Sequence, residues 1–123
     1  MVYEIDRTRA ARSDLEHIFA HLFRAHLDFG EDRGSAFMRA ARTVTKIDHA
    51  IDGLGDVPRQ GTHRTDLGEG PRMMTKGRAI LYLRVDERAR QVSMLAIFFG
   101  GQDHGTRMLS RLGAIGFPAP SAP

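Results

Sequence analysis

Three arginines lie in or beside predicted strands in the second half of the chain, where a planar guanidinium group could bind a carboxylate or a phosphate. Arg84 falls on the same strand face as Ile80 and Tyr82, and Arg72 and Arg78 lie in the neighbouring segments. Charge beside apolar surface is typical of an interface, which favours a docking surface for an acidic partner. A structural arginine that reaches solvent over a sheet edge has the same pattern, so both interpretations stay open.

Two histidines, His17 and His21, are one helical turn apart, as two zinc ligands on a helix can be. No third ligand follows at a suitable phase, so a solvated helix face is the favoured interpretation and no metal is predicted. Residues 68–70 lack the Lys and the Ser or Thr of a phosphate-binding loop, which argues against a nucleotide cofactor. His63 and Arg64 are interpreted as exposed loop residues.

Length and composition indicate one small domain. The chain has 123 residues, a formal net charge of +3 and no cysteine, which excludes disulfides and thiolate zinc sites. We expect a single domain over residues 1–113 and a flexible Pro- and Ala-rich tail over residues 114–123. The longest apolar run, Met94 to Phe99, is far below bilayer length, and the N-terminus has no apolar signal region, which predicts a cytoplasmic protein.

Two amphipathic helices are expected in the first half of the chain. Ser13 and Glu16 have the form of a capping box, and apolar residues then recur at helical spacing, so the first helix is expected from about Ser13 to Asp28. The second has apolar residues at steps of three and four from Phe37 to Ile51 and ends before Gly53. A short link makes the two helices an antiparallel hairpin.

Strand patterns lie on both sides of this hairpin. Strands are expected at Val2 to Ile5, Arg72 to Thr75, Arg78 to Val85 and Gln91 to Phe99, the last three joined as an antiparallel meander. We therefore predict an α+β fold with an N-terminal strand, a helical hairpin and a three-stranded antiparallel meander. A short C-terminal helix is expected around Met108, Leu109 and Leu112.

Both faces of the meander are apolar, and one helical hairpin can cover only one of them. Little chain remains to cover the second face, so we expect a partner protein there. Simple alternation along the strands predicts which side chains meet it. The residues predicted to bind this partner are Ile80, Tyr82, Arg84, Leu95, Ile97 and Phe99.

This order of elements resembles the RelE/ParE superfamily of toxins from bacterial type II toxin-antitoxin modules, over roughly Val2 to Arg111. The local motifs that carry the resemblance are Ser13 to Ile18, Pro58 to Gly61, Gly70 to Arg72, Tyr82 to Asp86 and Ala96 to Asp103. The chain looks more like the ParE branch. That likeness implies a cytoplasmic toxin that inhibits DNA gyrase by binding, with a cognate antitoxin as its partner and without sequence-specific DNA binding by the toxin alone. It also implies roles in growth inhibition and plasmid stabilisation.

The RelE branch gives an alternative, a ribosome-dependent mRNA endonuclease. Such chemistry needs cations that hold the scissile phosphate and groups that move protons. The candidates that the resemblance implies are Arg72, Lys76, Arg78 and Arg84 for the phosphate and His104 as acid or base. No Tyr or acidic base follows the last strand, so this catalytic set is incomplete, which favours the gyrase interpretation. Gly101 and Gln102 replace the more polar or basic exit of relatives, a departure that counts equally against a gyrase contact in that region. A third possibility is a non-toxic relative that binds only the antitoxin.

Overall fold

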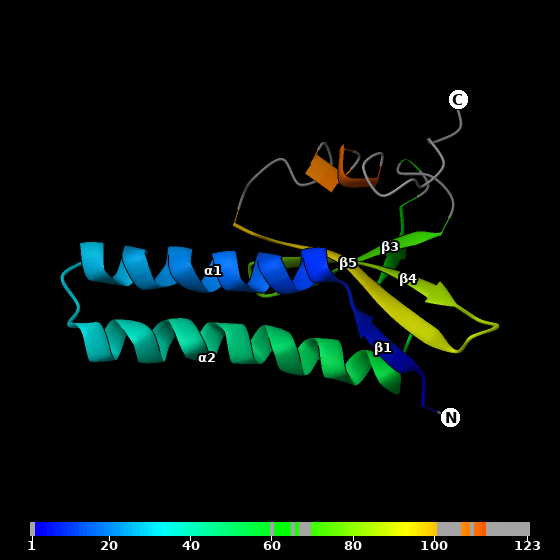
Figure 1. Ribbon diagram of the computed structural model, residues 1–123, viewed down its shortest axis with the longest axis horizontal. Coiled ribbons are helices and arrows are strands. Elements are labelled where there is room, and N and C mark those ends of the chain that lie inside the picture. The colour runs from blue at the N-terminus through cyan, green and yellow to red at the C-terminus, as the bar shows by residue number, and fades with distance from the viewer. Residues whose placement is uncertain are drawn as a thin grey trace.

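The computed structural model describes residues 2–59, 61–64, 66, 70–100, 107–108 and 110–112. A helical hairpin packs on one face of a five-stranded mixed sheet, and a short C-terminal helical segment lies on the other face (Figure 1). The α+β prediction is confirmed. In chain order the elements are β1 (Glu4–Arg7), α1 (Arg9–Asp28), α2 (Arg33–Asp52), the 3-10 turn η1 (Gly53–Gly55), β2 (Thr62–His63), β3 (Pro71–Lys76), β4 (Ala79–Asp86) and β5 (Gln91–Phe99).

The hairpin forms as expected, but the first helix begins earlier than predicted. Thr8 caps α1, since its hydroxyl oxygen accepts a hydrogen bond from the Ala11 backbone N–H at 3.2 Å. The capping-box prediction at Ser13 is therefore wrong, and Ser13 lies inside the helix. Asp32 caps α2 in the same way, accepting from the Ser35 backbone N–H at 2.8 Å. A capped N-terminus satisfies backbone donors that have no partner within the helix.

The predicted meander is the centre of a larger sheet, with strand order β1-β5-β4-β3-β2. β3, β4 and β5 are antiparallel, as expected, and β1 joins the sheet as a parallel partner of β5, with Glu4 opposite Gln91. The loop that precedes β3 contributes the short β2. Gly61 allows this loop to lie against β3, because it has a φ of +86° and any Cβ there would come within 2.4 Å of the Met73 carbonyl oxygen.

A β-bulge in β5 changes which side chains share a face. Tyr82 pairs with Ala96 but the next residue, Leu83, pairs with Met94, so Leu95 is an extra residue in β5. Such a bulge reverses the alternation of the strand beyond it. Leu95, Ala96 and Phe98 therefore point to one side of the sheet, while Ile97 and Phe99 join the hairpin side. The simple alternation predicted for this strand is wrong from Ala96 onward.

Two hydrophobic cores lie on the two faces of the sheet. The larger one joins the hairpin to Leu81, Leu83 and Met94. The smaller one is made by Tyr82, Leu95, Ala96, Phe98, Met108 and Leu112, with Met73 and Ile80 packed against it. The second face is thus covered by the chain's own C-terminal helical residues, and the expectation that it lies open for a partner is wrong. The predicted tail lies outside the described residues, as does Leu109.

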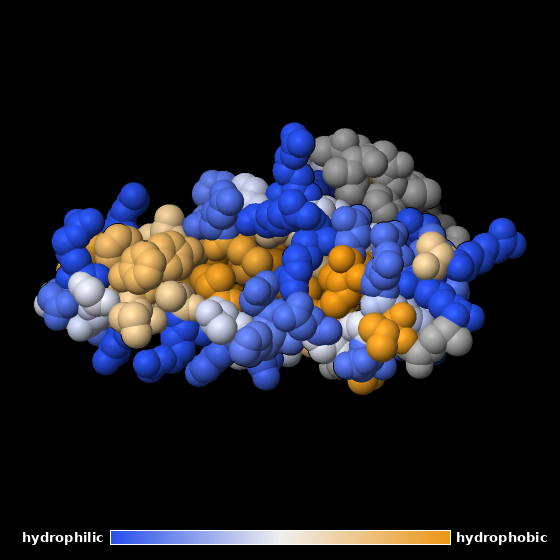
Figure 2. All heavy atoms as spheres, turned by 60° about the horizontal axis from the view of Figure 1, so that its bottom comes forward, coloured by the Kyte–Doolittle hydropathy of each residue, from blue (hydrophilic) through white to orange (hydrophobic). Residues whose placement is uncertain are grey.

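The end of the hairpin extends past the sheet, so that there the two helices pack mainly on each other (Figure 1). Apolar side chains form a band over the hairpin on the side shown in Figure 2, with hydrophilic residues on both sides of it. Within the described part of the chain, neither helix is apolar enough to cross a membrane.

Candidate functional site

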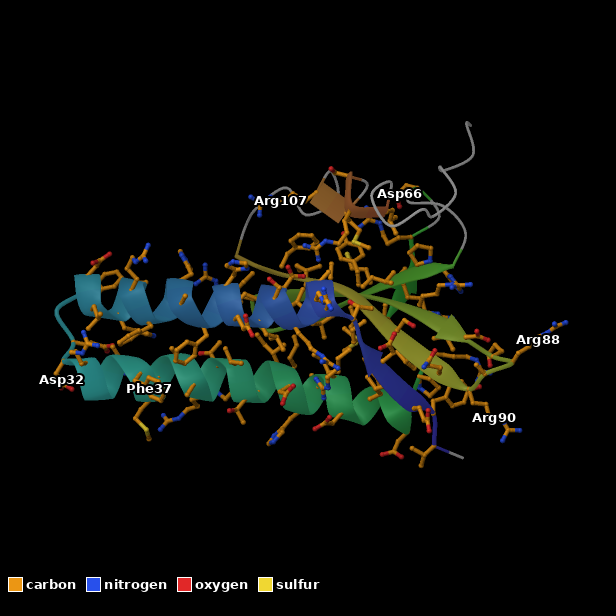
Figure 3. All side chains as sticks on the ribbon, in the orientation of Figure 1. Asp32, Phe37, Asp66, Arg88, Arg90 and Arg107 are labelled. Atoms are coloured by element: carbon orange, nitrogen blue, oxygen red, sulfur yellow. The ribbon has the colours of Figure 1, made fainter. Side chains whose placement is uncertain are left out.

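A groove lies between α1, the end of β5 and the C-terminal helical segment, with a volume of about 580 Å³. It combines an apolar floor with cationic and hydroxyl groups on its walls, a composition suited to binding a polar ligand or a polypeptide. Arg107 lies at the C-terminal segment, above the sheet (Figure 3). The described lining residues are Asp14, His17, Ile18, His21, Ile97, Phe98, Phe99, Arg107, Ser110 and Arg111.

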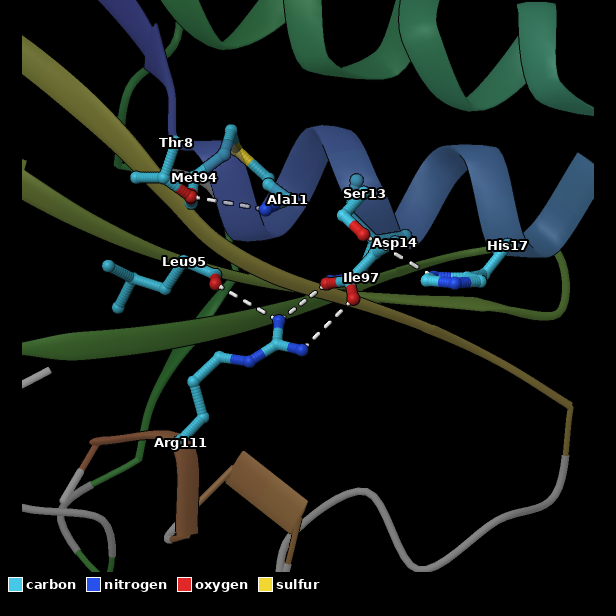
Figure 4. A network of polar contacts seen from close by, with 9 residues as sticks. All are labelled: Thr8, Ala11, Ser13, Asp14, His17, Met94, Leu95, Ile97 and Arg111. Carbon is cyan, nitrogen blue, oxygen red and sulfur yellow. Dashed lines mark hydrogen bonds and ion pairs between the residues drawn. The ribbon is translucent and has the colours of Figure 1, made fainter. Parts of the chain in front are cut away.

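The Asp14 carboxylate accepts three hydrogen bonds in this groove (Figure 4). Its Oδ2 accepts a hydrogen bond from the Ile97 backbone N–H at 2.8 Å and another from Arg111 Nη1 at 2.5 Å. Arg111 Nη2 donates to Oδ1 at 3.0 Å, so the guanidinium group binds the carboxylate through two nitrogens. Charge-assisted, bidentate pairs of this kind are among the stronger protein hydrogen bonds. Asp14 therefore joins α1, β5 and the C-terminal segment.

These bonds close an edge of the sheet that β1 leaves unpaired. β1 pairs with β5 only as far as Met94, because the chain then turns into α1. Thr8 Oγ1 donates to the Met94 carbonyl oxygen at 2.5 Å, and Arg111 Nη1 approaches the Leu95 carbonyl oxygen at 3.4 Å. Asp14 bonds the Ile97 backbone N–H on the same edge. Side chains therefore take the place of the neighbouring strand as hydrogen-bond partners of the β5 backbone here. Open strand edges invite pairing with other chains, so this arrangement protects the edge.

The second face of the sheet is held by aromatic and cationic contacts. Tyr82 is completely buried, and its ring meets Phe98 edge-on with centroids 5.8 Å apart. Arg111 lies over Phe98 at 5.6 Å, and Arg64 lies over Tyr82 at 5.9 Å. Arg64 Nη1 also donates to the Tyr82 hydroxyl at 3.1 Å, and its hydrogen bonds to Asp66 raise the pKa of Arg64. The interpretation of Arg64 as a merely exposed loop residue is wrong.

The predicted docking residues are divided between the two faces. Ile80, Tyr82 and Leu95 contribute to the second face, under the C-terminal segment, while Ile97 and Phe99 pack on the hairpin side. Arg84, on the Tyr82 side of β4, is exposed at the end of the strand. The structure therefore brings together only half of this predicted set as a buried cluster.

The cations proposed for RNA cleavage are also separated. Arg72 and Lys76 lie on the hairpin side of β3, and Arg72 donates to the Arg59 carbonyl oxygen at 2.9 Å. Arg84 lies on the opposite side, and Arg78 sits in a turn with its guanidinium group 5.2 Å from the Phe99 ring centroid. His104 lies outside the described residues. Four cations on different faces cannot all contact one scissile phosphate.

His17 and His21 both line the groove, one turn apart on α1. Ser13 Oγ lies 3.4 Å from His17 Nδ1. Among the described residues, no group of three side chains is arranged to hold a metal ion. These histidines place two imidazole rings in the groove that Arg107 also lines.

Thr8, Asp14 and Arg111 were not identified from the sequence as functional residues. Asp14 occurs in the Ser13 to Ile18 motif that carried the family resemblance, and Thr8 has the residue type of an N-cap. The partner of Asp14 lies 97 positions away along the chain, a separation at which local spacing gives no signal. The Leu95 bulge, which places Phe98 against the C-terminal segment, has no local signature either.

No family model and no curated protein matches the sequence. Solved structures do match: a chain of the chromosomal ParDE toxin-antitoxin system from P. aeruginosa has a TM-score of 0.64 and 22% identity, covering 81% of this chain and 98% of that one. The chain has the fold of the RelE/ParE toxins. A chain of the RelBE2 toxin-antitoxin complex from Mycobacterium tuberculosis matches with a TM-score of 0.56 and 18% sequence identity, covering 83% of this chain and 95% of that one. A mutant of E. coli toxin RelE in the free state matches with a TM-score of 0.58 and 9% sequence identity, covering 94% of this chain and 98% of that one.

Proposed function

We propose that this protein is the toxin of a type II toxin-antitoxin module, of the ParE-like kind, that inhibits DNA gyrase by binding. The fold supports the toxin role, because the neighbours from toxin-antitoxin systems align over at least 95% of their own chains. A toxin with this target acts in the cytoplasm, and its effect on a bacterial cell is growth inhibition.

The observation that favours gyrase over the ribosome is the separation of the candidate cleavage residues. Arg72 and Lys76 lie on one side of the sheet and Arg84 on the other. A nuclease of the RelE kind needs several cations and a proton-transfer group around one phosphate. Inhibition by binding needs no such cluster and requires only a complementary surface.

We further propose that a cognate antitoxin is the natural partner of the folded chain. An antitoxin that reached Ile80, Tyr82 and Leu95 would have to move the C-terminal segment, which Asp14 and Arg111 hold in place. The groove beside this ion pair is accessible without that change. A docking site on the second face would therefore include the C-terminal segment as part of the switch between free and bound toxin.

Two assays with the purified chain test the target. We expect inhibition of DNA supercoiling by purified gyrase and no new stops when a translated mRNA is mapped by toeprinting. Cleavage of the translated mRNA, lost in a double Arg72→Ala, Arg84→Ala variant, would instead establish the endonuclease alternative. Normal growth after induction of the chain alone, with neither activity in vitro, would support the third hypothesis, that the chain is a non-toxic relative that binds only the antitoxin.

A further inference from the structure

Both walls of the groove between α1 and the C-terminal segment carry groups that can bind an anion. His17 and His21 come from α1, and Arg107, Ser110 and Arg111 come from the C-terminal segment. In Figure 4, His17 projects from α1 and Arg111 projects from the C-terminal segment toward α1. An imidazole ring donates at least one N–H in either protonation state, and a guanidinium group donates several. A ligand in the groove would therefore meet hydrogen-bond donors from two sides.

The charge of this groove is positive. Of the described residues that line it, only Asp14 is acidic, and Arg111 neutralises its carboxylate through two hydrogen bonds of 2.5 and 3.0 Å. Arg107 then contributes one positive charge, and each histidine adds up to one more when it is protonated. The Arg78 guanidinium group, 5.2 Å from the Phe99 ring centroid, adds a cation at the end of β5. A concave surface with charge of one sign attracts ligands of the opposite sign.

The floor of the groove is apolar and partly aromatic. Ile18 and Ile97 are buried there, and Phe98 and Phe99 follow Ile97 at the end of β5. The volume of about 580 Å³ lies within the range of small-molecule sites. Such a floor suits a flat apolar group, whereas the walls suit an anion. The combination fits one small molecule that has both parts.

A second cavity, at the start of α2, lacks this combination. Its volume is about 490 Å³, and the described residues that line it include no aromatic side chain. Asp32 accepts a hydrogen bond from the Ser35 backbone N–H there, so an anion would meet a carboxylate at the helix terminus. Arg39, on the same cavity, binds Glu31 at 3.1 Å. This cavity therefore provides a control for the test below.

We propose that the groove of α1 and the C-terminal segment binds a small phosphomonoester that carries an aromatic group. The phosphate would lie between His17, His21 and Arg107, with the Ser110 hydroxyl as a further donor, and the ring would pack on Phe99. A phosphomonoester has a charge near −2 at pH 7 and three terminal oxygens, enough to accept from both walls. The proposal goes beyond gyrase inhibition and does not depend on it, because it concerns only this groove.

Titration of the full chain with AMP, followed by NMR, tests the proposal at about pH 7, where a phosphomonoester is mostly a dianion. We expect AMP to bind and to shift the amide resonances of Ile18 and Ile97. Inorganic phosphate should shift the same resonances but bind more weakly, because it has no ring. Adenosine and cyclic AMP should bind about tenfold more weakly than AMP, since the first has no phosphate and the second is a diester with a single negative charge.

Matched variants assign the binding to the groove. Arg107→Gln should weaken AMP binding about tenfold, the size expected for the loss of a charge-assisted hydrogen bond. A double His17→Ala, His21→Ala variant should weaken it by about the same factor. Arg42→Gln in the second cavity and His49→Ala on α2, both at exposed positions outside the groove, should leave it unchanged. Circular dichroism and thermal unfolding verify that each variant folds.

Several outcomes would overturn the proposal. Equal binding of AMP and cyclic AMP would mean that the groove does not recognise a dianionic phosphate. Equal binding of AMP and adenosine would reduce the groove to an apolar surface. Absence of saturable AMP binding, or binding unaffected by Arg107→Gln and by the double histidine variant, would also overturn it. Loss of binding in Arg42→Gln would place the ligand in the second cavity instead.

Discussion

The two apolar surfaces of this molecule outside the main core differ in how they are covered. The second face of the sheet is closed by Met108 and Leu112 and fixed by the Asp14–Arg111 pair. The aromatic cluster at the end of the hairpin (Phe19, Phe23 and Phe37) has no such cover among the described residues, and Phe37 is left half exposed. The first surface is completed by residues from the end of the same chain, whereas the second is positioned beyond the reach of the sheet. An apolar surface predicted from sequence patterns is therefore available to a partner only if no distant segment of the same chain covers it in the fold.

The largest expected effect contrasts a buried methionine of the second face with an exposed methionine of the hairpin. Met108 is fully buried on the sheet, and Met38, on the same helix as Phe37, is 61% exposed. We expect Met108→Ala to lower the free energy of unfolding by about 3 kcal/mol, because it leaves a cavity in the smaller core. Met38→Ala should change it by less than about 0.5 kcal/mol. Urea denaturation measures both, and equal effects would mean that the C-terminal segment does not pack on the sheet in solution.

A second comparison sets two ion pairs against each other. Asp14 is 13% exposed and bonds Arg111, while Asp48 is 48% exposed and bonds Arg7. We expect Asp14→Ala to lower the free energy of unfolding by about 2 kcal/mol, because it leaves the Ile97 N–H and the Arg111 guanidinium without an acceptor. Asp48→Ala should cost less than about 1 kcal/mol, as exposed ion pairs do. If the two variants unfold at the same urea concentration, the C-terminal segment is not held as described.

The smallest expected effect concerns the hairpin and pH. Hydrogen bonds from the Ser35 backbone and hydroxyl lower the pKa of Asp32. A carboxylate with a depressed folded-state pKa stabilises the fold above its ordinary pKa, near 4, and this contribution is lost as the pH falls through the folded value. Wild type should therefore lose stability relative to Asp32→Asn between pH 5 and about 3, since Asn caps the helix without titrating. Parallel thermal unfolding curves for the two proteins over that range would contradict the assignment.

Patterns of local origin were predicted well from the sequence. The hairpin followed from apolar steps such as Phe37 to Ile51, and the three-stranded meander from alternation and turns. The features that failed depend on distant residues. The first helix is capped by Thr8 and begins at Arg9 rather than at Ser13, and the Thr8 hydroxyl also bonds Met94. The Leu95 bulge exists only within a paired sheet. The bulge has no local pattern, whereas Thr8 has the residue type of an N-cap but competes with the capping-box pattern of Ser13 and Glu16.

For the candidate site too, local patterns were predicted correctly and features that depend on distant residues were not. Ile80, Tyr82 and Leu95 were correctly grouped on one face, but Ile97 and Phe99 were assigned to the wrong face because of the bulge. The cover over that face could not be predicted, since Arg111 reaches Asp14 only after the whole sheet has assembled. The role of these residues in binding an antitoxin stays a prediction.

The parallel pairing of β1 with β5 has a consequence for synthesis of the protein. Glu4 leaves the ribosome 87 residues before Gln91, which is its neighbour in the sheet. At bacterial rates of translation β1 waits on the order of 10 s for that neighbour. During this interval the hairpin is complete but the strand to which α1 docks does not yet exist. The nascent chain therefore exposes its helices before its sheet, and a molecule that recognised the hairpin could act before the protein is finished.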